Sequence, residues 1–410
     1  MSHIRFIVIS LFFFAYFVAA AAAAPDTLVV CPAEFRAALV PWESYRREQG
    51  HELSIVEPPT TASQLHAKIR EAARGNDLKF VVLIGDVAAV PTDYAEAKVN
   101  VHWGSEPTIA TDQLYADVEM EGGNGGDGSP DVAVGRIPAD TPEELAAVVR
   151  KVLRYEQRAD HGSWRRQIDV VAGAGGFGPL TDALIEGAAR SVFQQVVPSS
   201  YDVRQLKADP DETCTQISAG SFAWIYLGHG LPSMLDVADT PRGPRPILAT
   251  GDVSRLRCGA NSPLAVLIAC YTGAIDARDD SLAEELVLDE QGPIAVIAAT
   301  RVTMPYGNTV LGCELLRAAF TDRAATLGEV WMQAQQQTLV SAPPNDSLRT
   351  SLDAVARGVS PPPVDLAAER REHVLLYQLL GDPLLRLNYP PAESRPPARI
   401  ATVPGERSVK

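Results

Sequence analysis

A histidine and a cysteine each follow an apolar run in this chain of 410 residues. Phe222–Leu227 is followed by Gly228-His229-Gly230, and Leu264–Ala269 is followed by Cys270. Because ligands of open α/β sheets bind at the carboxyl ends of the strands, we expect both side chains at one edge of a sheet. A thiolate is the form of cysteine that attacks a carbonyl, and a nearby imidazole can take its proton and later protonate a leaving amine.

Backbone groups beside this pair could stabilise a developing oxyanion. The glycines that flank His229 let the backbone approach a ligand closely, and the N–H groups of Gly230 and Cys270 could form an oxyanion hole. Each residue also has a structural interpretation, since Cys270 could be a buried packing residue and His229 a turn residue. Only their joint placement favours chemistry.

The order of elements predicts an α/β fold of mostly parallel sheets flanked by helices. Several apolar runs are continuous, as expected for parallel strands that are buried on both faces. The expected strands are Thr27–Cys31, Leu53–Val56, Lys79–Ile84, Val132–Gly135, Ile168–Ala172, Phe222–Leu227, Leu264–Ala269 and Ile294–Ala299. Helical patterns alternate with them at Ala33–Gln49, Thr61–Arg74, Thr141–Gln157, Thr181–Val196, Leu282–Asp289, Thr309–Phe320 and Thr326–Leu339.

The chain divides into four predicted segments. Residues 1–24 have a basic start, an apolar stretch and a run of alanines, which is typical of a secretory signal peptide. An uncleaved N-terminal anchor is the alternative, because the apolar stretch is close to the length that spans a bilayer. Residues 25–160 form an N-terminal α/β subdomain, 161–388 a second subdomain with His229 and Cys270, and 389–410 a disordered tail.

Composition narrows the class of protein further. The net charge of −15 argues against a nucleic-acid partner, which would require clustered Lys and Arg. The five cysteines show no C-x-x-C spacing, so a zinc site is not expected. With the signal peptide removed we expect no membrane span, and a protein that is secreted, periplasmic or held at a cell surface.

Several blocks of sequence occur in the order of a known family. Tyr226–Gly230 and Leu267–Gly273 resemble the gingipain family of cysteine peptidases, which has a caspase-like fold. Further similar blocks are Leu83–Val87, Thr111–Tyr115, Asp131–Pro138, Ile294–Thr300 and Leu380–Leu385. The resemblance spans nearly all of 27–388 and implies a gingipain-type catalytic unit of two subdomains.

The resemblance implies endopeptidase chemistry on protein or peptide substrates, with Cys270 as nucleophile and His229 as base. It places the third, acidic member of the site at Asp131, where the gingipains have Glu. Gingipains cleave after Arg or Lys and use an acid near the start of the following helix, which would be Glu144 here. The stretch 304–306 reads Met-Pro-Tyr and departs from the Arg-specific members, which have a pocket-lining Trp there.

No cofactor is required for this chemistry, but family members bind structural calcium. An acidic, Gly-rich stretch offers oxygen ligands suited to that ion at Asp117, Glu119, Glu121, Asn124 and Asp127. A solvated loop is the alternative interpretation. Asp382, between Gly and Pro, is interpreted as a structural turn residue.

Other functions remain open at this point. A protein that kept the fold and lost activity would act as a binding or scaffold protein, and the departures at Asp131 and 304–306 motivate that alternative. Transpeptidation, in which an amine replaces water at the acyl-enzyme, is a variant that sequence does not separate from hydrolysis. A serine hydrolase is disfavoured because no G-x-S-x-G motif is found.

Overall fold

A ten-stranded sheet runs through the whole molecule. The structure is a computed structural model that describes residues 24–75, 77–119, 126–158, 162–176, 178–360, 364–387 and 389–390. The strand order of the sheet is β2-β1-β3-β6-β16-β15-β14-β9-β7-β8. The strands are β1 Thr27–Val30, β2 Leu53–Val56, β3 Phe80–Ile84, β6 Ala133–Ile137, β7 Gln167–Ala172, β8 Asp202–Leu206, β9 Ala223–Leu227, β14 Leu264–Ile268, β15 Ala295–Ala299 and β16 Tyr377–Leu380. This α/β architecture confirms the predicted fold class.

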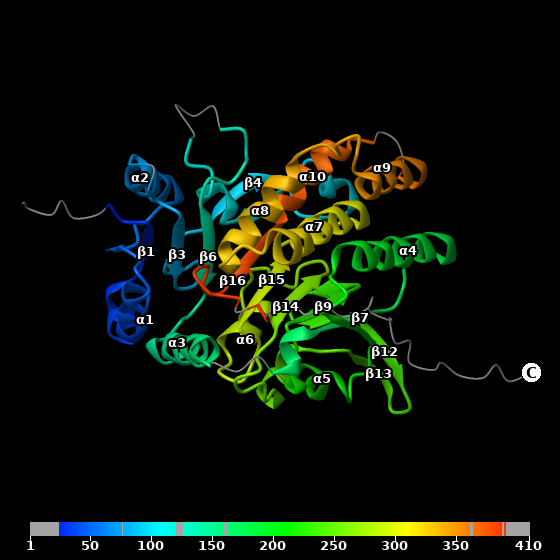
Figure 1. The fold of residues 1–410 in the computed structure, drawn as a ribbon, viewed down its shortest axis with the longest axis horizontal. Helices are drawn as coiled ribbons and strands as arrows, with labels where there is room; N and C mark the ends of the chain where they lie inside the picture. The colour runs from blue at the N-terminus through cyan, green and yellow to red at the C-terminus, as the bar shows by residue number, and fades with distance from the viewer. Residues whose placement is uncertain are drawn as a thin grey trace, which may run out of the picture.

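Two layers of helices cover the sheet (Figure 1). One layer contains α1 Arg36–Glu48, α3 Pro142–Gln157, α5 Thr213–Ala219 and α6 Leu282–Leu288. The other contains α2 Ala62–Ala73, α4 Pro179–Val196, α7 Pro305–Arg317, α8 Leu327–Leu339, α9 Ser347–Val359 and α10 Leu366–Leu376. Because both faces are covered, a strand such as β3 is buried at all five of its positions, which explains its unbroken apolar sequence.

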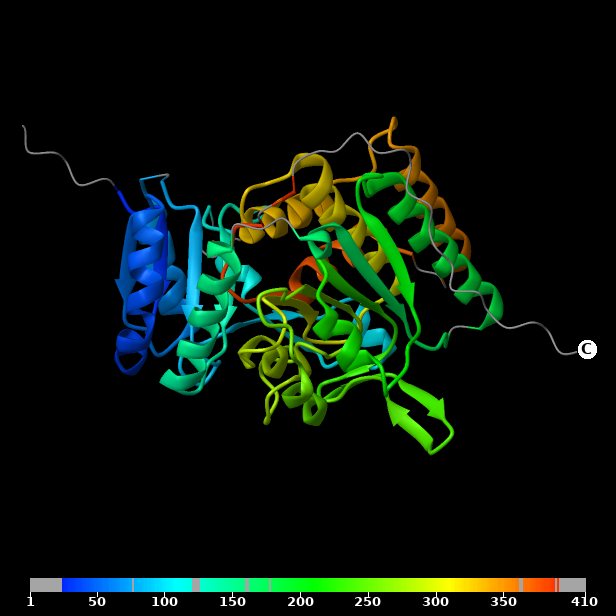
Figure 2. The ribbon, with the colours of Figure 1, turned by 60° about the horizontal axis from the view of Figure 1, so that its bottom comes forward.

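The sheet has two halves that meet at β16, the last strand in the sequence. All neighbours are parallel within β2-β1-β3-β6 and within β15-β14-β9-β7-β8. β16 runs antiparallel to β15 and joins β6 through one residue pair, Leu380 with Arg136. In Figure 2 the first half, in blue, and the second half, in green, lie on different sides of the molecule, and chain from both halves meets at the edge where β14 and β15 end.

Side-chain contacts at that edge link the two halves. The Tyr271 hydroxyl, after β14, donates to Glu106 at 2.7 Å, and the Arg301 Nε, after β15, donates to the Thr108 carbonyl at 2.9 Å. Glu106 and Thr108 belong to the chain that follows β3 and forms the hairpin of β4 Asp93–Glu96 and β5 Thr108–Thr111. The shared edge therefore receives residues from both halves.

The structure adds elements that periodicity missed. They include β8, β16, α5, α9, α10, the β4-β5 hairpin and two further small hairpins, which pair β10 Gly230–Leu231 with β11 Met234–Leu235 and β12 Val237–Thr240 with β13 Gly243–Pro246. The polar sequence of β8 carries no apolar signal because the strand lies at the end of the sheet. The helix expected at Thr309 begins at Pro305, whose fixed φ suits the first turn.

This geometry does not test the four predicted segments. The boundary at residue 160 separates the strands of one sheet half from most of the other, yet both halves share a sheet, so the two subdomains stay a prediction. The proposed signal peptide falls almost entirely outside the described residues, and so do residues 391–410 of the tail. Within the described ranges, no helix combines the length and the apolar character that a bilayer crossing requires.

Candidate active site

Cys270 stands just beyond β14 and differs from the other cysteines of the chain. All five are free thiols, and Cys270 alone is partly exposed. Burial raises the pKa of Cys31 to about 11 and the pKa values of Cys258 and Cys313 to about 12, which keeps those three thiols protonated at neutral pH. The accessible thiol of this protein is therefore the one that follows β14.

The backbone beside Cys270 adopts a conformation that L-residues rarely take. Tyr271 has φ 61°, in the left-handed region, and its N–H donates to the Arg301 carbonyl. The Gly273 N–H donates to the Ala299 carbonyl, which fixes the turn on the end of β15. Strained backbone of this kind persists where surrounding structure holds it and is common at active sites. The turn changes the direction of the chain directly after Cys270.

His229 stands opposite Cys270 by strand register. β9 and β14 are parallel neighbours in which Leu227 pairs with Ile268, so His229 and Cys270 each lie two residues beyond the last pair. Adjacent strands are about 4.8 Å apart, and residues two apart share one face of a strand. The two side chains also line the same cavity. The structure thus brings together the pair that the sequence singled out.

Glycines make room for this pair. A Cβ at Gly176 would lie 2.4 Å from His229 Nε2, and a Cβ at Gly230 would lie 2.7 Å from the Cys270 carbonyl oxygen. The Tyr226 hydroxyl donates to the His229 carbonyl at 3.1 Å and holds that turn. Gly230 therefore runs against Cys270, and the oxyanion hole formed by their N–H groups stays a prediction.

A chain of hydrogen bonds on the far side of Cys270 was missed by sequence reasoning. The Thr303 N–H donates to Cys270 Sγ at 3.3 Å, and the Thr303 hydroxyl lies 3.7 Å from the same sulfur. Asn308 Nδ2 donates to Thr303 Oγ1 at 2.9 Å, and the Tyr377 hydroxyl donates to Asn308 Oδ1 at 2.8 Å. With its oxygen accepting from Asn308, the Thr303 hydroxyl can donate its proton to a thiolate.

Asp131 is not brought to His229. It precedes β6 at the amino end of that strand, where its N–H donates to the Ala116 carbonyl and its carboxylate accepts from the Val118 N–H at 2.9 Å. β16, β15 and β14 lie between β6 and β9, which is roughly 19 Å at about 4.8 Å per strand. Because β6 and β9 are not neighbours in the sheet, the strand order does not bring Asp131 next to His229, and its catalytic role stays a prediction.

Glu144 is not among the described residues that line the cavity at Cys270. It forms a capping box at the start of α3: its carboxylate accepts from the N–H groups of Asp140 and Thr141, and its own N–H donates to the Thr141 hydroxyl. The helix start was correctly predicted, and that role accounts for the acid.

The carboxylates that do lie near His229 come from two other places. Asp182, in the first turn of α4, accepts from the Gly176 N–H at 3.3 Å and lines the cavity with His229. Asp236 accepts from the Ala174 N–H at 3.1 Å, and its own N–H donates to the His229 carbonyl. The sequence feature that could have pointed to both carboxylates is the Gly-rich turn after the predicted strand Ile168–Ala172. That strand ends at the same edge of the sheet as the strand that precedes His229.

Asp382 is structural, as its sequence context predicted. Its carboxylate is buried and accepts from Trp42 Nε1, from an Arg46 guanidinium nitrogen at 2.6 Å and from the Leu384 N–H. Arg46 also pairs with Glu156 at 2.8 Å. This buried network fastens the turn after β16 to α1 and α3.

The calcium loop stays a prediction. Glu121 and Asn124 lie outside the described residues, while Asp117 accepts from the Gly128 N–H and burial raises its pKa. Among the residues that the structure does describe, no group of three or more His, Cys, Asp or Glu side chains is arranged to hold a metal.

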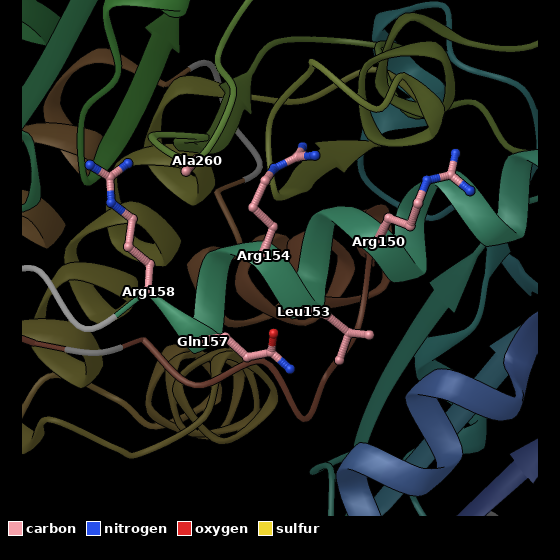
Figure 3. Close-up of a pocket in the computed structure, with 6 residues that line it drawn as sticks. All are labelled: Arg150, Leu153, Arg154, Gln157, Arg158 and Ala260. Carbon is pink, nitrogen blue, oxygen red and sulfur yellow. The ribbon is translucent and has the colours of Figure 1, made fainter.

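A second hollow of about 510 Å³ lies on the surface of α3, and Cys270 is not among the residues that line it (Figure 3). It is lined by Arg150, Leu153, Arg154, Gln157, Arg158 and Ala260. Two of the arginines pair with Glu290 and the third donates to Asn261, so their charges already have partners. None of the residues that line this shallow surface is a nucleophile.

The fold and the paired strand ends define a gingipain-type α/β protein with a cysteine and a histidine at one sheet edge. The chain belongs to peptidase family C25, whose family model matches residues 20–388. This is a family of cysteine peptidases, and the match confirms the resemblance drawn from the sequence blocks.

The sequence identity to individual relatives is low. The chain is 23% identical over 295 residues to gingipain R2 and 24% identical over 287 residues to Lys-gingipain, both from Porphyromonas gingivalis. Each match covers 67% of this chain but only 36% and 15% of the relative, so the chain spans about a third or less of their length.

Solved structures share the fold. A crystal structure of the Arg-specific cysteine proteinase gingipain R matches with a TM-score of 0.65 and 18% identity, over 89% of this chain and 79% of that one. A complex of the pro- and mature domains of the Porphyromonas gingivalis enzyme matches with a TM-score of 0.66 and 19% identity, over 88% and 79%.

Proposed function

We propose that this protein is an exported cysteine endopeptidase that hydrolyses peptide bonds through Cys270 and His229. The observation that carries the proposal is the register of β9 and β14, which sets the two residues opposite each other at the mouth of one cavity. Export rests on the signal-like residues 1–24 of the sequence.

The reaction would proceed through a thioester. His229 takes the thiol proton, and the Cys270 sulfur attacks the scissile carbonyl to form a tetrahedral intermediate. The backbone N–H groups of Gly230 and Cys270 would stabilise its oxyanion. As the intermediate collapses, the C–N bond breaks and the imidazolium gives its proton to the leaving amine. His229 then takes a proton from water, whose oxygen attacks the thioester and releases the acid and the thiol.

Thr303 and Asp182 would hold the reacting groups in place. The Thr303 N–H and hydroxyl point donors at the sulfur, which favours its charged form. Asp182 binds the Gly176 turn against which the His229 ring rests, and we assign it the role of orienting that ring in place of Asp131. Cation binding at the loop that begins with Asp117 remains a separate proposal.

The test is digestion of a mixed-sequence peptide library by the purified protein, with products identified by mass spectrometry. Cleavage by the wild type that disappears in Cys270→Ala supports the proposal, and the products gain the mass of water if the reaction is hydrolysis. Cys313→Ala is the matched control, because this thiol borders the same cavity but is buried.

The alternative is a binding or scaffold protein with this fold and no activity. The absence of a contact between Asp131 and His229 is the observation that favours it. A folded wild type that cleaves no library peptide, with or without added calcium, would establish this alternative over the peptidase.

A further inference from the structure

The cavity at Cys270, here named the Cys270 cavity, is a deep space between the sheet and two helices. Its volume is about 410 Å³, within the range of small-molecule and side-chain sites. The strands β7, β9 and β14 form its floor, and α4 and α7 form its roof. Cys270 and His229 lie at its mouth, at the carboxyl edge of the sheet.

The floor of the cavity is apolar along β9 and β14, and the end strand β8 adds Val203 and Gln205 to the lining. Cys270, Ile268 and Val266 alternate on one face of β14, as do His229, Leu227 and Ile225 on β9, and all six line the cavity. Four residues at about 3.3 Å each extend roughly 13 Å from the thiol toward the interior. The roof adds the apolar side chains Ile185, Val192, Phe193, Leu315 and Leu316.

Charged groups of the lining lie on α4 and already have partners. Asp182 accepts from the Gly176 N–H near the mouth, and Glu186 pairs with Arg190 at 2.6 Å with both side chains more than half exposed. None of the described residues on the strand floor carries a carboxylate. A Lys or Arg side chain reaching down this cavity would bury a positive charge against a floor without carboxylates, which is costly, and the acids of the lining lie only on α4, at Asp182 and Glu186.

The roof holds a glycine where a side chain would fit. Gly312 lies on α7 and lines the cavity, and a Cβ built there meets no atom within 4 Å. The thiol of Cys313, next to it, has a pKa raised to about 12 by burial. The interior beside Gly312 is thus unfilled, and the polar side chains that α7 adds to the lining are Asn308 and Thr309, one turn earlier in the helix.

We propose that the Cys270 cavity binds a large apolar side chain of the substrate residue that supplies the scissile carbonyl, so that the enzyme cleaves after residues such as Leu, Met or Phe. This inference rests on the proposed peptidase function. It replaces the basic preference that the family resemblance implied, because Glu144 is not among the described residues that line the cavity.

Covalent probes test the preference directly. Peptidyl acyloxymethyl ketones that carry norleucine, Phe, Ala or Lys next to the ketone would be reacted with the purified protein. The Cys270 thiolate displaces the carboxylate, so a C–S bond forms as the C–O bond breaks, and mass spectrometry locates the adduct. We expect the norleucine probe to react at least tenfold faster than the Lys probe, which has a side chain of similar length with a charged end.

Gly312→Leu is expected to fill the cavity and to slow the norleucine and Phe probes at least tenfold, while the Ala probe and iodoacetamide react at wild-type rates. Gly187→Leu is the matched control, since Gly187 is an exposed helical glycine of α4 with no atom within 4 Å of an added Cβ. That variant should leave every rate unchanged.

The outcomes distinguish failure of the apolar preference from failure of the peptidase function on which it rests. A Lys probe that matches or exceeds norleucine, or a Gly312→Leu variant that slows all reagents equally, overturns the apolar preference and leaves the peptidase function standing. Failure of every ketone, together with iodoacetamide labelling no faster at Cys270 than at the buried cysteines, overturns the peptidase function. If Gly312→Leu does not fold, the ratio of norleucine to Lys in the wild type decides.

Discussion

Two cysteines follow buried strands of this sheet, one in each half, and only one is placed for chemistry. Cys31 follows β1 directly and is fully buried, with its thiol against the Pro32 carbonyl and the short helix Ala33–Phe35 immediately after it. Cys270 follows β14, stays partly exposed and precedes a residue with φ 61° that turns the chain away. Position at a strand end is thus insufficient, because the packing of the following residues decides access.

The two halves of the sheet, like their cysteines, differ in whether space is left unfilled around them. The first half is fastened by buried ion pairs, such as Arg136 with Asp112 at 2.7 Å and Arg46 with Asp382 at 2.6 Å. The second half contains the Cys270 cavity between its sheet and α4 and α7. Because the second half also has a buried ion pair, Arg349 with Glu314, the difference between the halves is the unfilled space next to a nucleophile.

The largest expected contrast is in thiol reactivity. In the folded protein we expect iodoacetamide to alkylate Cys270 at least about 100-fold faster than Cys31, because burial both blocks access and keeps the Cys31 thiol protonated. Peptide mapping by mass spectrometry after timed quenching gives both rates in one sample. Equal rates would show that the two strand ends are equivalent and would remove the basis of the comparison.

Removing a buried ion pair from the first half should lower the free energy of unfolding substantially. Arg136→Met leaves the carboxylate of Asp112 buried and unpaired, and we expect a loss of about 3–5 kcal/mol in the free energy of unfolding, measured with urea. Arg47→Met removes an exposed pair with Glu43 and should cost less than about 1 kcal/mol. A similar small loss for both variants would contradict the role assigned to the buried pair.

A pair of Asp→Asn variants distinguishes the two carboxylates proposed for the site. Asp182→Asn should lower kcat/KM at least about tenfold through poorer orientation of His229. Asp131 lies at the amino end of β6, so Asp131→Asn should change kcat/KM less than about twofold. The reverse order of effects would restore the prediction made from the family resemblance and remove Asp182 from the site.

The smallest expected effect is a pH dependence of stability in the second half. Burial raises the pKa of Glu284, which is 2% exposed, to about 8, against an ordinary value of 4.5. The folded chain therefore keeps a proton that the unfolded chain releases, so stability falls as pH rises from about 4.5 to about 8. We expect Glu284→Gln to be more stable than wild type at pH 8, on the order of 2 kcal/mol, and to show little difference at pH 4.5.

Urea titrations at pH 4.5, 6 and 8 measure this difference. Asp280, whose pKa burial raises to about 6, titrates in the same window, and Asp280→Asn separates its contribution. Wild type and Glu284→Gln with identical slopes would show that Glu284 ionises freely in the folded protein.

The sequence by itself determined the local structure and the reactive pair. Continuous apolar runs identified buried parallel strands, the Thr141–Glu144 motif identified the start of α3, and His229 and Cys270 were found because each directly follows such a run. These features depend on near neighbours in the chain, for which residue type and spacing suffice.

Only the tertiary structure decided which strands are neighbours and where space remains. β16 comes last in the chain yet lies at the centre of the sheet, so β6 and its Asp131 are held away from β9 and His229. Strand order and the filling of space between layers depend on contacts between residues far apart in sequence, which local patterns do not encode. The same long-range packing leaves α4 and α7 above an unfilled cavity and brings Asp182 to the Gly176 turn beside His229.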